Sequence, residues 1–263
     1  MNANLSILRR YVTDFVNRHD FSVIGDIMQT DYTLHTGGHV ISGRDDVYRS
    51  AVARQFQQFP GLVFTPHEVM VAGDCIAVRF TEHGASTRHA GRPAAWESIG
   101  FYKLRDGRLA GCAIEQDYFS RRRQLEEGPA MIVDNPAIAP WDSPEAPPSP
   151  AGEQTVRNWL VSGKLTDVTG VRIDDQRDTN RVDRILAQSS ITITDLVSAG
   201  DRVAFHARQE GVLADGFGDA AAGTPAWMHC TGIVRVRDGA VTVGHVLRDR
   251  WGLYRRLATR TAP

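Results

Sequence analysis

One stretch of the sequence occurs twice and decides the fold. Residues 71–78, Val71-Ala72-Gly73-Asp74-Cys75-Ile76-Ala77-Val78, return as residues 198–205, Ser198-Ala199-Gly200-Asp201-Arg202-Val203-Ala204-Phe205. Shorter matches follow in the same order: Gly91-Arg92-Pro93-Ala94 with Gly223-Thr224-Pro225-Ala226, Arg105-Asp106-Gly107 with Arg237-Asp238-Gly239, and Asp117 with Asp249. The offset grows from 127 residues at Gly73 and Gly200 to 132 at Gly107 and Gly239, so one loop is longer in the second copy. Ordered matches of this kind predict two copies of one domain.

The first copy begins with helices and continues with strands. Apolar residues recur at helical spacing over 5–16 and 21–28, and a further helix is expected from about Ser42 to Gln58. The segment 31–35 between them is typical of a strand. Strand-like runs follow at 63–71, 75–83, 96–104 and 108–118, joined by Gly-Asp and Asp-Gly hairpin turns. This order predicts an α+β domain with an antiparallel sheet.

A proline-rich stretch separates the copies. It predicts an extended linker over 129–150, between a domain at 1–128 and a second domain at 151–263. In the second copy we expect helices at 154–161 and 179–188, an ambiguous run at 168–173, and strands at 191–198, 202–211, 227–236 and 240–250. Only 49 residues, from Ala151 to Ala199, precede its Gly-Asp turn, against 72 in the first copy. The second copy is therefore expected to be shortened in its helical part, with no counterpart of the strand at 31–35.

Composition narrows the class of protein. The 263 residues fit two ordinary domains, and 42% hydrophobic with 23% charged residues is typical of soluble proteins. A net charge of −1 provides no general attraction for nucleic acid or anionic membranes. The three cysteines lack metal-ligand spacing, which favours reduced thiols and a cytoplasmic location. No signal peptide or membrane-spanning run is expected.

The order of these elements resembles the SnoaL-like polyketide cyclases of the nuclear transport factor two-like superfamily. The resemblance rests on the Asp-Tyr-x-x-His strand at 31–35, Gly43-Arg44-Asp45, Phe59-Pro60, the two hairpins and Asp117. It implies a curved antiparallel sheet wrapped by helices into a cone with an apolar pocket. It also implies pairing through the sheet, so that the two copies form an internal pseudo-dimer, with a homodimer as the alternative. The family pattern has a Trp where this chain has Ala113 and His245, so the pocket chemistry is expected to differ.

Four residues are the candidates for acid/base catalysis: Asp117, Glu115, His35 and Asp31. The resemblance places Asp117 where the family has its acid/base aspartate, and a carboxylate in an apolar cone can exchange protons near neutral pH. Glu115 shares a strand face with Asp117, and paired carboxylates can divide acid and base roles. A histidine beside an aspartate is a plausible proton-transfer pair. The structural alternatives are a strand-end Asp117 paired with an arginine, and surface positions for Asp31 and His35.

The substrate-binding candidates are Trp96, Tyr11, Arg79 and His83, with core packing as the alternative for the two aromatic residues. In the second copy, Asp249, His245 and His229 are candidates, and His206 lies on an adjacent strand. His83, His89 and His35 lack the spacing and carboxylate support of a metal site, and neither a metal nor an organic cofactor is expected. Glycine-rich nucleotide loops and a Gly-x-Ser-x-Gly elbow are absent from the sequence.

These observations leave three hypotheses. The first is a cofactor-independent cyclase that acts on an apolar polyketide-like intermediate. The second is an epoxide hydrolase, dehydratase or isomerase that uses the same two-group acid/base logic. The third is a ligand-binding or scaffold protein without turnover.

Overall fold

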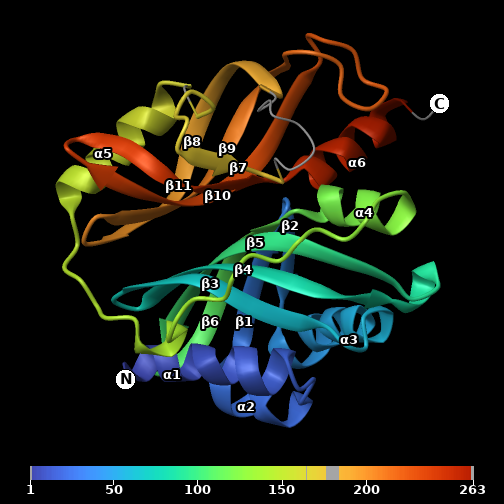
Figure 1. Ribbon diagram of the computed structural model, residues 1–263, viewed down its shortest axis with the longest axis vertical. Helices are drawn as coiled ribbons and strands as arrows, with labels where there is room; N and C mark the ends of the chain where they lie inside the picture. The colour runs from blue at the N-terminus through green and yellow to red at the C-terminus, as the bar shows by residue number, and fades with distance from the viewer. Residues whose placement is uncertain (1, 164, 176–183, 262–263) are drawn as a thin grey trace. The chain divides into compact units, whose positions relative to one another are not determined.

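A computed structural model of the chain describes residues 2–163, 165–175 and 184–261 (Figure 1). Contacts divide the chain into two compact units. The first unit comprises Met1–Ile114 and Phe119–Ala146, and the second comprises Glu115–Tyr118 and Pro147–Pro263. The short segment Glu115–Tyr118 thus belongs to the second unit, although its first two residues are the end of the strand Arg108–Gln116 of the first repeat.

Helical segments come first in the first unit. They are α1 (Ala3–Arg10) with its π-helical continuation η1 (Tyr11–Val16), η2 (Phe21–Val23), α2 (Ile24–Ile27), η3 (Arg44–Tyr48) and α3 (Arg49–Gln58). The side chain of Asn2 begins α1, because its oxygen accepts a hydrogen bond from the Leu5 amide at 3.0 Å. Later helical segments are η4 (Thr87–His89), α4 (Tyr118–Glu126) and η5 (Pro140–Asp142).

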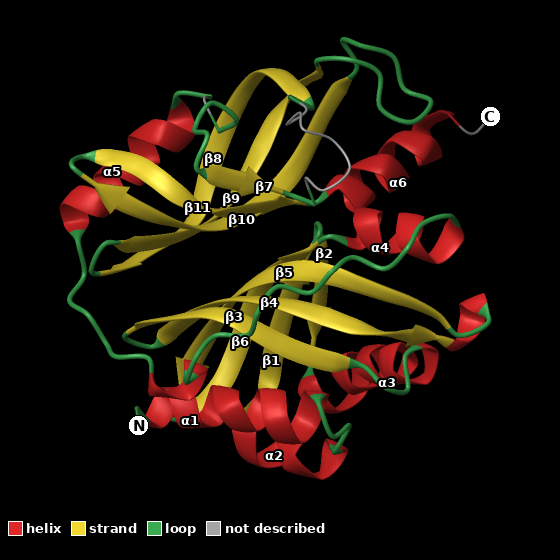
Figure 2. Cartoon of the chain, viewed as in Figure 1, coloured by secondary structure: helices red, strands yellow, loops and turns green. Residues whose placement is uncertain are grey.

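The described strands of the first repeat form a six-stranded sheet in the order β2-β1-β6-β5-β4-β3 (Figure 2). Their bounds are β1 (Met28–Thr36), β2 (His39–Ser42), β3 (Val63–Ala72), β4 (Cys75–Ser86), β5 (Arg92–Arg105) and β6 (Arg108–Gln116). Neighbouring strands are antiparallel, except that β1 and β6 are parallel. Helices α1, α2 and α3 cover one face of this sheet. The buried core includes Leu8, Phe15, Ile27, Phe80 and Phe101.

The second unit repeats this plan with fewer helices. Its elements are α5 (Pro150–Val161), β7 (Val171–Ile173), β8 (Leu186–Ala199), β9 (Arg202–Leu213), β10 (Pro225–Arg237), β11 (Ala240–Arg248) and α6 (Arg250–Thr261). The described strands are ordered β7-β11-β10-β9-β8. Val156 and Leu160 of α5 pack on Phe205 and other apolar side chains of the sheet. The prediction of two α+β repeats is confirmed.

The predicted hairpins have the backbone that their sequences require. Asp106 and Gly107 both have positive φ, and Asp238 and Gly239 repeat this conformation. Two consecutive residues with positive φ are typical of the type I′ turn, whose twist matches that of antiparallel strands.

Three local predictions differ from the structure. The strand expected at 108–118 ends at Gln116, and α4 begins at Tyr118. The helix expected at 179–188 falls partly on residues 179–183, outside the described residues, and Leu186–Gln188 belong to β8. The strand at 31–35 does have a counterpart, because β7 pairs in parallel with β11 as β1 does with β6. The parallel pairs escaped prediction because such strands are not joined by a local turn.

Candidate functional site

The interior face of the first sheet carries a buried carboxylate. Alternation along β4 places Val78, Phe80 and Glu82 on the same face. Phe80 stacks on Phe64, with ring centroids 3.6 Å apart, and Glu82 is buried. Glu82 therefore continues an apolar row, and a buried carboxylate requires hydrogen-bonding partners.

Two side chains bind Glu82. The indole Nε1–H of Trp96 on β5 donates to Glu82 Oε2 at 2.9 Å, and Gln55 Nε2 on α3 donates to the same oxygen at 3.3 Å. Trp96 is fully buried, and the Arg121 guanidinium lies 4.9 Å from its ring centroid. Trp96, expected as a substrate contact, is therefore both a core residue and the partner of a charged group.

Tyrosines gather on the same side of this sheet. The hydroxyls of Tyr11 and Tyr48 lie 3.0 Å apart, and Tyr32 contacts the Tyr48 ring edge to face, with centroids 4.9 Å apart. Burial raises the pKa of Tyr11, Tyr48 and Tyr102 well above the ordinary value, and the negative charge of Glu82 raises those of Tyr48 and Tyr102 further. These phenols stay neutral near pH 7 and keep their hydroxyl protons.

The opposite face of β4 holds Arg79 and His83. Arg79 is buried and donates to Glu97 at 2.8 Å and to Asp134 at 3.1 Å. His83 Nε2 lies 3.0 Å from Thr65 Oγ1, and burial lowers the pKa of His83. Arg79, expected as a substrate contact, is therefore buried in an ion pair with Glu97.

Asp31 and His35 lie on exposed parts of β1. Both carboxylate oxygens of Asp31 accept hydrogen bonds from Arg105, at 2.7 and 2.9 Å. Between them, Tyr32 is fully buried. The interior face of this strand thus presents a tyrosine, and the Asp31–His35 pair lies on the other face.

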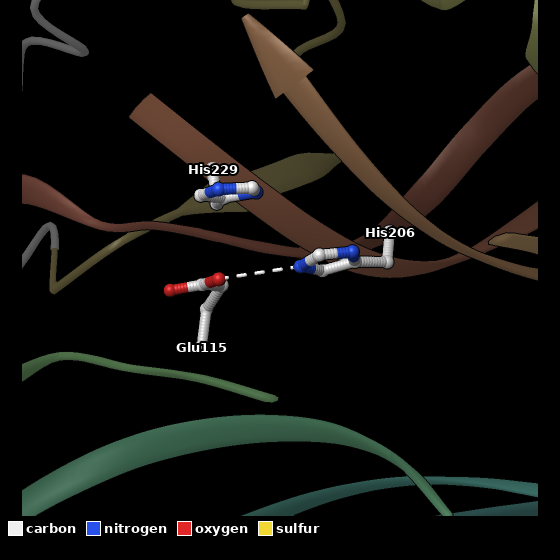
Figure 3. Close-up of side chains that lie close together, drawn as sticks. All are labelled: Glu115, His206 and His229. Atoms are coloured by element: carbon white, nitrogen blue, oxygen red, sulfur yellow. Dashed lines mark hydrogen bonds and ion pairs between the residues drawn. The ribbon is translucent and has the colours of Figure 1, made fainter. Parts of the chain in front are cut away.

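Glu115 belongs to a cluster in the second unit (Figure 3). His206 Nε2 on β9 lies 3.3 Å from Glu115 Oε1, and the His206 ring stacks on His229 of β10, with centroids 5.3 Å apart. Glu115 and His206 are buried, and His229 is half-buried. The structure thus brings together Glu115 and His229, which the sequence had assigned to separate candidate sites.

Asp117 is bound by an arginine in the same unit. Its two oxygens accept hydrogen bonds from Arg250 Nη2 at 2.7 and 2.6 Å, and Asp117 Oδ2 also accepts from the Asp175 amide at 3.1 Å. Asp249, at the equivalent position of the repeat, instead caps α6 by accepting from the Gly252 amide at 2.7 Å. His245 is half-buried on β11, where its register partner is Ile233 of β10.

Glu82, Tyr48 and Tyr102 are the residues that sequence reasoning missed. The available signal was the alternation of β4, because Glu82 follows Val78 and Phe80 at two-residue intervals. A carboxylate in such an apolar row requires hydrogen-bonding partners, and its indole partner was already a candidate.

Together these features define an α+β domain whose sheet carries a buried carboxylate and tyrosines beneath a helical layer. Residues 8–111 match the SnoaL-like domain family, so the first repeat contains a SnoaL-like domain. The resemblance to the SnoaL-like family that the sequence indicated is confirmed for these residues. The comparison with curated proteins found no match.

Similar solved structures each correspond to about half of the chain. IdmH from Streptomyces antibioticus, a candidate polyketide cyclase, is 18% identical, with 47% of this chain and 99% of that chain covered and a TM-score of 0.42. TsrD from Streptomyces laurentii is 19% identical and has a TM-score of 0.43. The match covers 47% of this chain and 95% of TsrD. An NTF2-like protein of unknown function from Burkholderia pseudomallei is 19% identical and has a TM-score of 0.42. The match covers 48% of this chain and 99% of that protein.

Membrane insertion through a helix has no support in the described residues. None of the helices over that part of the chain is both long and apolar enough to cross a bilayer.

Proposed function

We propose that the SnoaL-like domain catalyses ring closure of an apolar, polyketide-like intermediate by acid/base chemistry, without an organic cofactor. The observation that carries the proposal is the buried Glu82 carboxylate, bound by Trp96 at 2.9 Å and set among neutral tyrosines. A carboxylate can accept a proton from carbon, and a neutral phenol can stabilise the oxyanion that results.

In the proposed reaction, Glu82 removes a proton from a carbon that lies between two carbonyl groups of the substrate. The electron pair of that C–H bond moves into an enolate, whose oxygen accepts a hydrogen bond from the Tyr11–Tyr48 pair. The enolate carbon then attacks a second carbonyl of the same molecule and forms the new C–C bond. The alkoxide produced takes a proton back, so that product and substrate are isomers.

The surroundings of Glu82 support an apolar substrate. Phe64, Phe80 and Trp96 lie on the same side of the sheet, and all three are buried. Aromatic walls exclude water and hold flexible apolar chains in folded conformations, which brings reacting carbons together.

Asp117, assisted by Glu115, His35 or Asp31, is the alternative acid/base assignment. Arg250 binds both oxygens of Asp117, which leaves fewer lone pairs for a proton from substrate. Glu82 is instead bound by the neutral donors Trp96 and Gln55 and lies in an apolar, aromatic part of the domain. For this reason we propose Glu82 as the primary base.

The test is turnover of methyl esters of β-polyketo acids by the full chain, followed by liquid chromatography and mass spectrometry. Glu82→Gln is expected to lower turnover by about 100-fold or more, with an unchanged circular dichroism spectrum. Deuterium incorporation at the activated carbon in D₂O should fall in parallel, because proton removal precedes ring closure. Glu126→Gln is the matched control, since Glu126 is exposed and paired with Arg122.

Each other result rejects part of the proposal. Full turnover by Glu82→Gln with loss in Asp117→Asn would transfer the base to Asp117. Incorporation of ¹⁸O from labelled water would favour epoxide or ester hydrolysis over ring closure. Ligand binding by the wild-type chain without any turnover or exchange would leave the non-catalytic hypothesis.

A further inference from the structure

We infer that Glu115, His206 and His229 form a binding site for a divalent transition metal, with Zn²⁺ as the principal occupant. One ligand atom from each residue lies within 4.8 Å of the other two. The three residues belong to the second unit, and the site is separate from Glu82 in the first. Two imidazoles and one carboxylate are a ligand set that Zn²⁺ accepts, with a further position left for water.

The separation of His206 and Glu115 fits coordination by a common ion. Ligand atoms at about 2.0–2.1 Å from a tetrahedral zinc ion lie about 3.3–3.4 Å from one another. The His206 Nε2 to Glu115 Oε1 distance is 3.3 Å. An ordinary N–H···O hydrogen bond is shorter, at about 2.9–3.0 Å. Because the ligand atom of His229 lies within 4.8 Å of the other two, a side-chain adjustment of about 1.5 Å or less completes the set.

Thr194 determines which nitrogen of His206 faces Glu115. The Thr194 hydroxyl donates its single hydrogen to the His206 carbonyl oxygen at 2.8 Å. The same Oγ1 lies 2.7 Å from His206 Nδ1, so it must accept the Nδ1–H there. In the neutral ring, Nε2 then presents a lone pair toward the carboxylate. Two acceptors that face each other are satisfied by a proton on Nε2, which gives the ion pair, or by a metal ion that both atoms bind.

This arrangement is the one that metal-binding histidines use. Such a histidine donates its outer ring N–H to an oxygen, which fixes the tautomer and the ring orientation. The backbone provides the geometry here, because the pairing of β8 and β9 shifts register between Ile193 and Asp195. Thr194 is the extra residue of that bulge, and bulges commonly redirect a side chain.

The first repeat shows that the two histidines replace a different pair. The repeat offsets equate His206 with Arg79 and His229 with Glu97. In the first unit Arg79 donates to Glu97 at 2.8 Å and to Asp134 at 3.1 Å, so a cationic side chain occupies the position of His206. In the second unit the same strand positions hold two imidazoles, and the buried carboxylate is supplied by Glu115. The second repeat has therefore exchanged an ion pair for a set of metal ligands.

The ligand types select the ion. Imidazole nitrogen suits zinc, cobalt, nickel and copper, whereas Mg²⁺ and Ca²⁺ prefer oxygen ligands. Arg256, whose charge interacts with that of Glu115, is hydrogen-bonded to Asp249 at 3.2 Å and to the Trp227 carbonyl at 2.9 Å. A divalent ion at the three ligands would balance the Glu115 charge directly.

The experiment is metal titration of the full chain after removal of bound ions with dipicolinate. We expect one equivalent of Zn²⁺ by calorimetry, and visible d–d absorption when Co²⁺ is added instead. Mg²⁺ should neither bind at comparable concentration nor displace Co²⁺. A chain that binds neither Zn²⁺ nor Co²⁺ stoichiometrically would overturn the inference, and this measurement requires no variant.

Variants locate the site. His206→Gln, His229→Gln and Glu115→Gln should each weaken Zn²⁺ binding at least about 100-fold, and Thr194→Val should weaken it about 10–100-fold. His39→Gln is the control, because His39 is exposed on β2 of the first unit. Circular dichroism confirms that each variant is folded. Unchanged affinity in folded His206→Gln and Glu115→Gln would place the ion elsewhere and reject the site.

Discussion

The indole nitrogen of Trp96 donates a 2.9 Å hydrogen bond to the buried carboxylate of Glu82. The two residues are direct register partners on β5 and β4. Because both side chains lie within the domain, each depends on the other: the carboxylate needs a donor, and the indole N–H needs an acceptor.

Trp96→Phe is expected to destabilise the protein by about 1–3 kcal/mol, because it removes the 2.9 Å indole hydrogen bond to the buried Glu82 carboxylate. Replacing Glu82 by leucine in the same chain should recover part of the loss, since no acceptor is then left unsatisfied. Equilibrium unfolding in urea measures both effects. Trp141→Phe is a control on a half-buried tryptophan in η5. Equal losses in Trp96→Phe and the control would show that the hydrogen bond contributes nothing.

Alkaline pH should unfold the protein through its buried tyrosines. Burial raises the pKa of Tyr11, Tyr32, Tyr48 and Tyr102 well above 10.0. The unfolded chain therefore loses these protons at a lower pH than the folded chain. The free energy of unfolding falls as the pH rises through the tyrosine pKa of the unfolded chain. Absorbance of phenolate should rise together with the loss of circular dichroism. Ionisation of all tyrosines in a chain that keeps its native spectrum would contradict the prediction.

The parts of the fold that local sequence determines could be predicted. Asp106-Gly107 and Asp238-Gly239 specify tight turns through their own backbone preferences, and the flanking strands follow. The pairing of β1 with β6 and of β7 with β11 could not be predicted in the same way, because parallel neighbours are far apart in sequence. The three-residue β7 is also too short to show any periodicity.

The candidate-site residues show the same difference between features set by neighbouring residues and contacts between residues far apart in sequence. Glu82 was predictable from the alternation of β4, which depends only on neighbouring residues. The partner of Asp117 was not, because Arg250 is 133 residues away in sequence. The meeting of Glu115 with His206 spans 91 residues and relies on the bulge at Thr194, which no turn or periodicity signals.

His67 should make the first unit sensitive to acid. Burial lowers the pKa of His67, and the charge of Arg79 lowers it further, whereas the hydrogen bond with the Asn135 carbonyl opposes this shift. The unfolded chain binds a proton at this histidine more readily than the folded chain, so stability falls as pH decreases below about 6.5. His67→Gln should therefore reduce the loss of stability between pH 7 and pH 5 in urea unfolding. His35→Gln, on an exposed part of β1, is the control. An unchanged pH dependence in His67→Gln would exclude this contribution.

Two ion pairs of the same chemical type should differ in their contribution to stability. Arg250 and Asp117 retain 16% and 2% side-chain exposure, whereas Arg105 and Asp31 retain 53% and 66%. Arg250→Leu leaves the buried carboxylates of Asp117 and Asp174 without their shared cation and should cost about 3–5 kcal/mol.

Arg105→Leu removes an exposed, solvent-screened pair and should cost about 1 kcal/mol or less. Urea unfolding of the two variants makes the comparison, and raising the salt concentration should weaken only the exposed pair appreciably. Asp117→Asn together with Arg250→Leu should be less destabilised than Arg250→Leu alone, because one unpaired charge has been removed. Equal, small losses in both single variants would mean that Asp117 does not depend on Arg250, and would strengthen the alternative in which Asp117 exchanges protons with a substrate.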